Sequence, residues 1–328
     1  MNDLKLSVII PVYNAAPYLP GMLDALVRQT DSRFEALFVN DGSTDESLAV
    51  LRRAQAELEL NIRVIDRENG GASAARNSGI SAAQGELITF ADADDTISEK
   101  FAEDIIANAV KGGVAVFRHS RVVDDAVRFD KRDGSIVKME SEEAMRALML
   151  NPTRFGVYDL AIDRAFLMDS GVRFQEGWPY YEDYDFILRL FNACGDISAV
   201  ERCNYCYRAA PGSLMNIFNE ERLRCLQLFD NIHSLYCSHR IEFYDDFLKW
   251  FSARLRWSVI WQACVHMPIR DALKFAAGAE NRRAMRSLTD YPDRRIALSA
   301  AVFTICPPVF AIIMRRMGKR RTLLPENQ

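Results

Sequence analysis

The first 120 residues alternate between short apolar runs rich in β-branched residues and longer amphipathic runs, and this alternation restricts the fold more than any other feature. The short runs are typical of strands buried on both faces, and the longer runs have the apolar spacing of helices. The pattern predicts an α/β fold in which helices flank a mostly parallel sheet. The expected strands are 6–12, 35–40, 62–66, 86–91 and 114–120, and the expected helices lie within 17–29, 41–58, 72–84 and 98–110.

The helix expected within 41–58 has a start signal. Ser43 and Thr44 are residue types whose side-chain oxygens accept hydrogen bonds from the first N–H groups of a helix, and acids follow them. We therefore expect Ser43 or Thr44 to cap this helix.

The texture of the sequence changes near residue 215. Beyond this point the chain has long amphipathic stretches with helical spacing and lacks strand signals. A chain of 328 residues is long enough for one large domain or two. We expect an α/β domain over 1–214, built from halves 1–120 and 121–214, and a helical C-terminal region over 215–328.

Net charge and cysteine usage exclude several classes of function. The formal net charge of -4 gives no basic excess for binding nucleic acid. All seven cysteines lie from Cys194 onward, and their odd number and irregular spacing favour reduced thiols in the cytoplasm. The opening MNDLKLSVII lacks the pattern of a secretory signal. Cys203 and Cys206 form a lone CxxC without a second pair, so we expect no zinc site there.

Polar residues follow three of the expected strands. Asn14, Asp41 and the segment 92–95 all fall at carboxyl ends, where parallel sheets bind ligands. One interpretation of the segment FADADD is a solvated turn that leads into the next helix. The other is a site for a divalent cation, because a cation offsets the repulsion between closely spaced carboxylates. Oxygen ligands of this kind suit Mn²⁺ or Mg²⁺.

Five segments stand out over roughly residues 5 to 210: LSVIIPVYN, FVNDGSTDES, GGASAARNSGI, FADADD and YYEDYDFILRL. Their order and approximate spacing resemble those of family 2 glycosyltransferases. The resemblance implies a GT-A fold, which is Rossmann-like, and an inverting reaction that uses a nucleotide-sugar. It also implies that 1–120 is the nucleotide-binding half and 121–214 the acceptor half.

The resemblance assigns roles to residues of the first four segments. Asp41 is expected to accept a hydrogen bond from the base, usually uracil, and Arg76 to reach the base, ribose or diphosphate. Asp92-Ala93-Asp94 matches the DXD element, with Asp92 near the ribose and Asp94 as metal ligand. Asp95 either supports this element or caps a helix. The nucleotide-binding residues are expected to be Pro11, Val12, Tyr13, Asn14, Asp41, Arg76 and Asp92, and the metal ligands Asp94 and Asp92.

The fifth segment supplies the expected catalytic pair, Glu182 and Asp183. Acids at a helix start can simply interact with the helix dipole. The resemblance instead makes Asp183 the catalytic base and Glu182 its neighbour, and two adjacent acids raise each other's pKa values. The aromatic residues just before the pair either pack in the core or form an acceptor platform. These residues are Trp178, Tyr180 and Tyr181, and Tyr207 and Arg208 in YRAAPGS (207–213) are expected to close the site.

The segment 294–325 contains no acid and has basic residues on both sides of the uncharged run 297–314. Pro307 and Pro308 would interrupt a helix in this run. We expect the segment to bind the surface of an anionic membrane, on the cytoplasmic face of the inner membrane. A single spanning helix, or a helix packed on the protein, are the alternatives.

These observations predict an enzyme that transfers one sugar from a nucleotide-sugar, by family habit a UDP-sugar, to a glycan or lipid-linked oligosaccharide. The product would belong to a bacterial surface polysaccharide, lipopolysaccharide or exopolysaccharide. A sugar-1-phosphate nucleotidyltransferase is one alternative, but IIPVYNAAPYLP is not the glycine-rich basic loop that such an enzyme needs. A non-catalytic nucleotide-binding scaffold on a membrane is another, and it would tolerate loss of Asp183.

Overall fold

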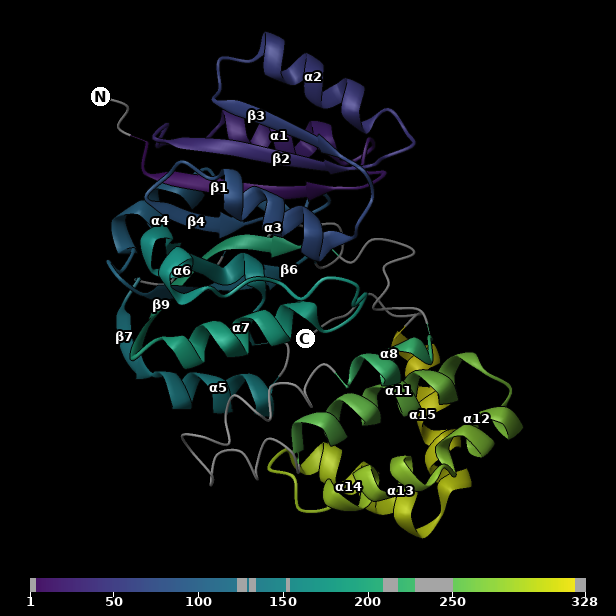
Figure 1. Cartoon of the computed structure of the whole chain (residues 1–328). Helices are drawn as coiled ribbons and strands as arrows, with labels where there is room; N and C mark the ends of the chain where they lie inside the picture. The colour runs from purple at the N-terminus through teal and green to yellow at the C-terminus, as the bar shows by residue number, and fades with distance from the viewer. Residues whose placement is uncertain are drawn as a thin grey trace. The chain divides into compact units, whose positions relative to one another are not determined.

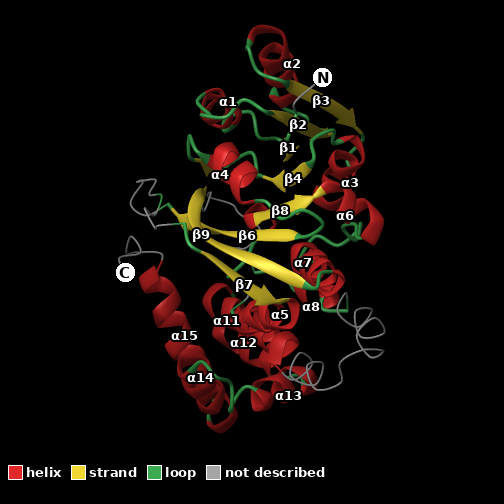
Figure 2. Ribbon diagram, turned by 90° about the vertical axis from the view of Figure 1, so that its left-hand side faces the viewer, coloured by secondary structure: helices red, strands yellow, loops and turns green. Residues whose placement is uncertain are grey.

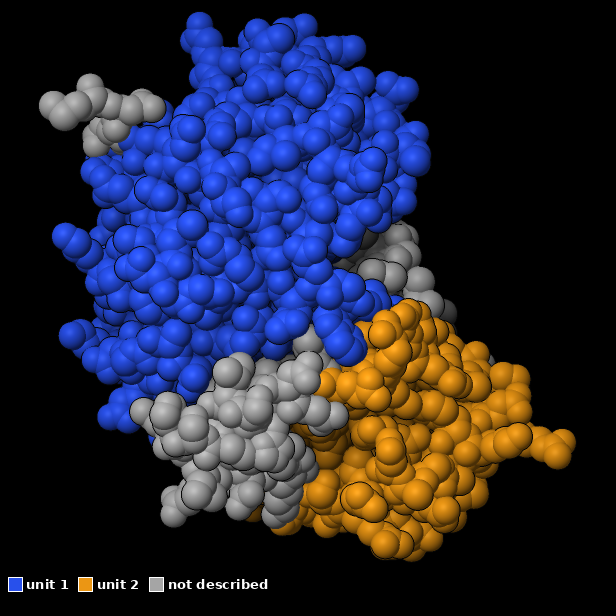
Figure 3. All heavy atoms as spheres, viewed as in Figure 1, with its two compact units in different colours: residues 1–145, 153–210 blue, residues 146–152, 211–328 orange. Residues whose placement is uncertain are grey.

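The computed structural model describes residues 4–122, 129, 134–151, 154–208, 218–227 and 250–321. The chain divides into two compact units, which Figure 3 shows in different colours. Unit 1 comprises Met1–Met145 and Thr153–Ala210, and unit 2 comprises Arg146–Pro152 and Pro211–Gln328. The boundary expected at residue 214 lies outside the described residues.

Unit 1 contains a nine-stranded sheet with helices on both of its faces, so the predicted α/β class is confirmed (Figure 1). The strands are β1 (Leu6–Val12), β2 (Phe34–Asp41), β3 (Ile62–Arg67), β4 (Leu87–Phe90), β5 (Thr96–Ile97), β6 (Val114–Arg121), β7 (Ile136–Glu140), β8 (Leu160–Asp163) and β9 (Asp196–Tyr207). The helices are α1 (Leu19–Val27), α2 (Ser47–Glu57), α3 (Ala72–Ala82), α4 (Phe101–Asn108), α6 (Arg164–Ser170) and α7 (Glu182–Ala193), with a short 3-10 helix at Val157–Asp159. Helix α5 (Ser141–Leu150) is divided between the units, because Arg146–Pro152 belong to unit 2.

The sheet has the strand order β3-β2-β1-β4-β8-β6-β9-β5, and β7 pairs with β9. The neighbours β1, β2, β3 and β4 are parallel, as are β6 and β9, whereas β8 runs antiparallel to both β4 and β6. Both β5 and β7 run antiparallel to β9. The carboxyl ends of β1, β2 and β4 therefore lie at one edge of the sheet, as the sequence predicted.

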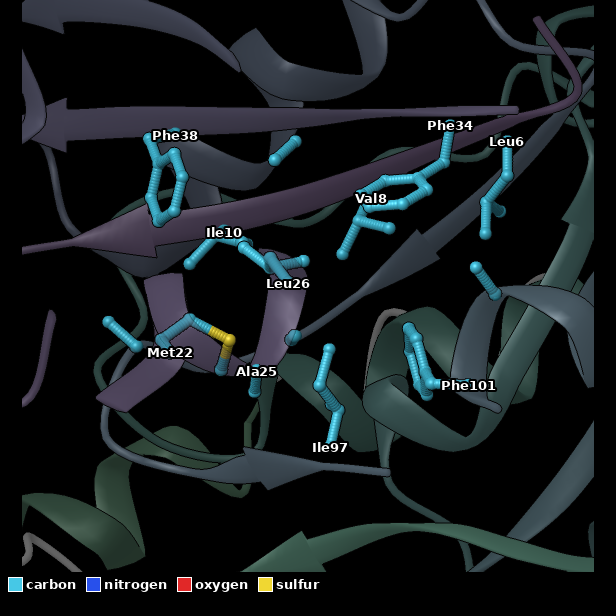
Figure 4. Close-up of a cluster of buried hydrophobic side chains, with 14 of the residues drawn as sticks. Leu6, Val8, Ile10, Met22, Ala25, Leu26, Phe34, Phe38, Ile97 and Phe101 are labelled. Atoms are coloured by element: carbon cyan, nitrogen blue, oxygen red, sulfur yellow. The ribbon is translucent and has the colours of Figure 1, made fainter. Parts of the chain in front are cut away.

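One apolar core of unit 1 lies between this sheet and helices α1 and α4 (Figure 4). Leu6, Val8 and Ile10 alternate along β1 and are completely buried. Met22 and Leu26, one helical turn apart on α1, point into the same core. The continuous apolar run of the strand and the helical spacing of the apolar residues on α1 explain why the sequence located both elements.

The two faces of the sheet are covered by different helices. In Figure 2, α1 and α4 lie on one face, and α3, α6 and α7 lie on the other. Helix α3 approaches β1 so closely that a Cβ atom on Gly79 would lie 2.3 Å from Cγ2 of Ile9. Only glycine therefore allows this approach without displacing a neighbour.

The prediction that Ser43 or Thr44 caps helix α2 is wrong. Helix α2 begins at Ser47, and Glu46 occupies its N-cap position without a side-chain hydrogen bond. Ser43 instead accepts a hydrogen bond from the N–H of Asn14 at 3.0 Å, and the N–H of Thr44 donates to Oδ1 of Asn14 at 2.8 Å. These side chains join two loops at the ligand end of the sheet, so tertiary contacts outweighed the local capping preference.

The opposite end of the sheet is fixed by one completely buried carboxylate, Glu35 at the start of β2. It accepts hydrogen bonds from Oγ of Ser7 at 2.6 Å, from Nη1 of Arg63 at 2.7 Å and from the N–H of Gln84 at 2.7 Å. Oγ of Ser7 in turn accepts from the N–H of Gly85 at 2.9 Å. The network links β1, β2, β3 and the turn before β4, and its partners offset the cost of burying the charge.

The described part of unit 2 is helical, with no strand among its described residues. One apolar core joins the five helices between residues 252 and 321, and it includes Phe303 and Phe310, whose rings meet edge to face. The helices of unit 2 are α8 (Glu221–Cys225), α11 (Ser252–His266), α12 (Ile269–Ala276), α13 (Ala279–Ser287), α14 (Arg294–Ile305) and α15 (Pro307–Arg321).

The uncharged run 297–314 is divided between α14 and α15, with a break at Cys306 before the two prolines, as expected. Its inner residues, such as Ala300 and Ala311, are packed in the core of unit 2. Arg315 also points inward, where it donates to the backbone carbonyls of Cys264 and Met267 at the end of α11. Among the described residues, no helix is long and apolar enough to cross a bilayer. Residues 322–325 of the basic segment lie outside the described ranges.

Candidate active site

The loops after β1 and β2 are tied together at the ligand end of the sheet. Asn14 adopts a left-handed conformation with φ of 49°, and its side-chain oxygen accepts from the N–H groups of Thr44 and Asp45. Tyr13, beside it, is 55% exposed. Pro11 and Val12 are the last residues of β1, and Val12 is buried. The residues expected in the nucleotide pocket thus lie at the end of β1 and in the loop that follows it, which hydrogen bonds hold to the loop after β2. We call this the braced loop, and the ring of Tyr13 projects from it.

Asp41 at the end of β2 is almost completely buried and holds the loop that precedes α3. Its Oδ1 accepts from Nη1 of Arg67 at 2.6 Å, and its Oδ2 accepts from the N–H of Gly71 at 2.7 Å. The N–H of Gly70 lies 3.1 Å from Oδ1. Gly71 has φ of 87°, a conformation that favours glycine. This carboxylate positions the start of α3, and the expected bond to a nucleotide base stays a prediction.

Arg76 on α3 connects the two acidic segments that the sequence singled out. Its Nη2 lies 3.0 Å from Oδ1 of Asp92, and its Nη1 lies 3.3 Å from Oε1 of Glu182. The side chain is 8% exposed, and its guanidinium lies over the ring of Phe174 at 5.4 Å. Burial lowers the pKa of Arg76, but the charges of Asp92 and Glu182 outweigh this effect and raise the pKa above its ordinary value. A permanent positive charge therefore lies between the two acidic segments.

The three carboxylates of the segment 92–95 differ in their burial and in their hydrogen-bond partners. Asp95 is buried and accepts hydrogen bonds from the hydroxyl of Tyr205 and from the N–H of Arg208, at 2.5 and 2.7 Å. Helix α4 begins at Phe101, so Asp95 does not cap it. Burial and the neighbouring charge of Asp92 raise the pKa of Asp95 to about 8. Of the two roles left open for Asp95, the geometry favours the supporting one, because it ties this segment to the end of β9.

Asp92 and Asp94 remain half-buried and are the candidate metal ligands. Burial, followed by the charge of Asp92, raises the pKa of Asp94. A bound cation would offset the repulsion between these two carboxylates. The described residues contain no group of three or more His, Cys, Asp or Glu side chains that could hold a metal ion by themselves. The donor set instead fits a Mg²⁺ or Mn²⁺ ion held by one or two carboxylates together with substrate phosphates.

Asp183 lies in the first turn of α7. The preceding residue Glu182 begins the helix, and Tyr181 at the N-cap has φ of 67°. Oδ1 of Asp183 accepts from the N–H of Tyr184 at 2.8 Å. Burial and then the charge of Glu182 raise the pKa of Asp183 to about 7, although Arg76 and the N–H of Tyr184 act in the opposite direction. A carboxylate with this pKa accepts a proton readily near neutral pH.

The three aromatic residues before this pair differ in exposure. Tyr180 and Tyr181 are 5% and 4% exposed, and the ring of Tyr181 stacks against that of Tyr184. Their burial matches the packing interpretation, while Trp178 is half-buried. The acceptor platform stays a prediction for all three. Of the segment 207–213, residues 209–213 lie outside the described ranges, and Arg208 reaches the site through its backbone bond to Asp95.

Sequence reasoning missed Tyr158, which lies in the 3-10 helix before β8. Its ring stacks on that of Tyr205, with centroids 4.3 Å apart, and the ring of His119 meets it edge-on at 5.1 Å. His119 is held in turn by Asp159, whose Oδ2 lies 2.8 Å from Nδ1. Burial, and then the charges of Asp159, Asp92 and other site acids, raise the pKa of Tyr158. No sequence motif marks Tyr158. Its position near the segment 92–95 depends on the order of the strands in the sheet, which the sequence pattern does not contain.

Comparisons with known proteins show which family and which solved structures this chain resembles. A family model described as Glycosyl transferase family 2 matches residues 7–169. The chain is 31% identical to the uncharacterized glycosyltransferase EpsJ of Bacillus subtilis over 64% of this chain and 63% of EpsJ. It is 28% identical to the poly(ribitol-phosphate) beta-N-acetylglucosaminyltransferase TarS of Staphylococcus aureus over 62% of this chain and 35% of TarS. The matches thus cover less than two thirds of either relative.

Solved structures show the same fold. The crystal structure of S. aureus TarS 1-349 in complex with UDP-GlcNAc aligns with a TM-score of 0.63 and 19% identity, over 97% of this chain and 91% of that chain. A crystal structure of TarS covered to 55% by the alignment gives a TM-score of 0.59. These likenesses confirm the GT-A fold. Because the family model also spans the first four of the five sequence motifs, residues 7–169 belong to glycosyltransferase family 2.

Proposed function

We propose that this protein is an inverting, metal-dependent glycosyltransferase that moves one sugar from a UDP-sugar to a hydroxyl group of a glycan. The bridge from Asp92 through Arg76 to Glu182 carries this proposal. It brings the expected donor-binding segment and the expected catalytic pair, 90 residues apart in the sequence, into one site.

Asp183 is the base of the proposed reaction. It takes the proton from the acceptor hydroxyl while that oxygen attacks the anomeric carbon, and the bond from this carbon to the diphosphate oxygen breaks. Attack from the face opposite the leaving group inverts the anomeric carbon in one displacement. The pKa of Asp183, raised to about 7 by burial and by Glu182, gives it the basicity that this step needs.

The departing diphosphate gains negative charge, and the site must stabilise it. Asp94 and Asp92 would hold Mn²⁺ or Mg²⁺, which supplies Lewis-acid stabilisation of the diphosphate oxygens when bound. Arg76 contributes through its fixed charge. Its ion pairs with Glu182 and Asp92 also offset the cost of partly burying these two carboxylates. Since its side chain is only 8% exposed, this electrostatic role is better supported than direct contact with the nucleotide.

The uridine moiety is proposed to lie on the braced loop after β1. The exposed ring of Tyr13 offers a face on which a pyrimidine can stack. The crystal complexes of S. aureus TarS with UDP-GlcNAc and with UDP support a uridine nucleotide as the donor class.

The acceptor side is proposed more broadly. TarS is named for transfer of N-acetylglucosamine to poly(ribitol-phosphate), which supports a glycan or lipid-linked oligosaccharide of a bacterial surface polymer as acceptor. A cytoplasmic site on the inner membrane surface would give access to such an acceptor. Half-buried Trp178 is the aromatic residue before the base that retains exposed surface for a sugar ring.

Isothermal titration of the full chain with UDP-, dTDP- and GDP-sugars, each with Mn²⁺, Mg²⁺ or a chelator, tests this function. We expect one nucleotide class to bind, with an affinity that falls in chelator and in Asp94→Asn but not in Asp183→Asn. Release of the nucleoside diphosphate should follow in the wild type and be lost in Asp183→Asn. A folded protein that binds none of these donors would contradict the proposal. Pyrophosphate release from a nucleoside triphosphate and a sugar 1-phosphate would instead identify a nucleotidyltransferase.

A further inference from the structure

The outer surfaces of α14 and α15 expose a concentration of apolar side chains. Of the thirteen large apolar residues exposed in the described part of the chain, six lie between residues 298 and 317, and Ile305 is 84% exposed. Single exposed apolar residues are ordinary, but a group of this size on two consecutive helices is not. We call this group the outer apolar residues: Leu298, Ile305, Val309, Ile312, Ile313 and Met317.

Helix α15 is apolar on opposite sides along its first turns. Phe310, Ala311 and Met314 face the core of unit 2. Val309, Ile312 and Ile313 follow the spacing i, i+3, i+4 and are exposed on the other side. A helix on a protein surface in water normally places polar residues on its outer side, so this pattern indicates that another apolar medium covers it.

The charges around the outer apolar residues are almost all positive. Arg294 and Arg295 are exposed at the start of α14, and Arg316 is exposed on α15. Residues 250–321 contain fourteen Lys and Arg residues against four Asp and Glu residues, although the whole chain has a net charge of -4. No acid occurs between Arg294 and Pro325. Apolar residues framed by basic residues match the surface of an anionic lipid bilayer.

We propose that the outer apolar residues insert into the surface of an anionic membrane, with Arg294, Arg295 and Arg316 on lipid headgroups. A second copy of the chain fits this surface less well, because it would bring two positively charged faces together. The break at Cys306 divides the apolar run into two short helices, α14 and α15, and neither is long enough to span a bilayer. Attachment of these residues to a membrane is independent of the chemistry proposed for unit 1.

Co-sedimentation of the full chain with phosphatidylcholine vesicles, with and without phosphatidylglycerol, tests the inference. We expect binding only when phosphatidylglycerol is present, and we expect it to weaken as salt rises. The double variant Ile312→Asp/Ile313→Asp should lower the partition constant more than about tenfold, because it removes apolar surface and adds repulsion. Arg294→Gln/Arg295→Gln should lower it roughly fivefold per charge.

Val27→Asp is the matched control, because Val27 is an exposed apolar residue on α1 of unit 1. It should sediment like the wild type. Circular dichroism and donor titration on the same samples separate loss of attachment from misfolding and from failure of the proposed function. A folded wild type that stays in the supernatant, or equal binding by the double variant and Val27→Asp, would overturn the inference. So would a wild-type dimer that the double variant converts to a monomer without any vesicle binding.

Discussion

The two units of this protein treat charge in opposite ways. Residues 1–210 contain 34 Asp and Glu residues against 23 Lys and Arg residues, whereas residues 211–328 contain 11 against 18. Unit 1 buries carboxylates such as Asp41 and Asp95 at strand ends and gives each of them hydrogen-bond donors. Unit 2 packs an apolar core and leaves the arginines of α13 and α14 largely on its surface. The proposed chemistry on a nucleotide-sugar and the proposed attachment to an anionic surface would need these opposite arrangements, and the two proposals concern separate units.

The contrast between the units predicts that catalysis depends on carboxylates of unit 1, and loss of Asp183 is the strongest test of this prediction. Asp183→Asn removes the proposed base and should lower the transfer rate by roughly 100-fold or more. Donor affinity should remain, because this side chain takes no part in the proposed donor site. A nucleoside diphosphate release assay measures the rate, and Asp169→Asn, an exposed acid on α6, is the control. An Asp183→Asn enzyme with the wild-type rate would exclude Asp183 as the base.

Arg76 tests whether the balanced charges of unit 1 also hold it together. Arg76→Met leaves Asp92 and Glu182 without their shared cation, and we expect unfolding to become easier by about 2 kcal/mol, below the range for a fully buried pair. Chemical denaturation measures this change. Arg28→Met removes an exposed ion pair with Asp24 and should cost less than about 1 kcal/mol. Equal losses in the two variants would show that the bridge adds no more stability than an exposed ion pair.

Two glycines compare the packing of the units directly. A Cβ on Gly79 would lie 2.3 Å from Ile9, and a Cβ on Gly318 of α15 would lie 2.4 Å from Cγ2 of Val265 on α11. Either substitution by alanine should destabilise its own unit by about 1 to 3 kcal/mol. Gly79→Ala should also weaken donor binding, because it shifts the helix that carries Arg76. Gly318→Ala should leave donor binding unchanged, and calorimetric titration with thermal unfolding would show whether the units respond separately.

The smallest expected effect is a shift in pH dependence. Asp183 must be deprotonated to act as base, so activity should rise with pH through its pKa of about 7. Glu182 helps to raise that pKa, and Glu182→Gln should therefore move the acid limb of the rate profile to lower pH. Glu176→Gln is the control, since Glu176 is exposed and binds Asn77. An unmoved acid limb in Glu182→Gln would show that Glu182 does not set the basicity of Asp183.

Sequence patterns located the parallel part of the fold well, because buried strands and amphipathic helices have local periods. The expected strand 6–12 agrees with β1, and 62–66 falls within β3. Four strands, β5, β7, β8 and β9, were not expected. The two-residue β5 and the exposed β7 exist only through pairing with β9. Strand order itself depends on contacts between distant segments, which periodicity does not contain.

The site divides in the same way. Motifs led to Asp92, Arg76 and Asp183, but no motif indicated that Arg76 binds both acidic segments at once. It also left two roles open for Asp95, whose partners Tyr205 and Arg208 lie more than 100 residues away. Tyr158 carries no motif and was missed. Long-range hydrogen bonds and ring stacking decided these positions, and they depend on side-chain placement that one sequence does not reveal.

The Glu35 network has a consequence for how such an enzyme can change over time. Sliding β2 against β1 or β3 would separate Glu35 from Ser7 and Arg63, leaving a completely buried charge without donors. The register of the strands is therefore set at the end remote from the site. Loops at the other end can be lengthened, shortened or exchanged without shifting the sheet beneath them. A single buried acid thus leaves donor and acceptor preference free to diversify on a constant framework.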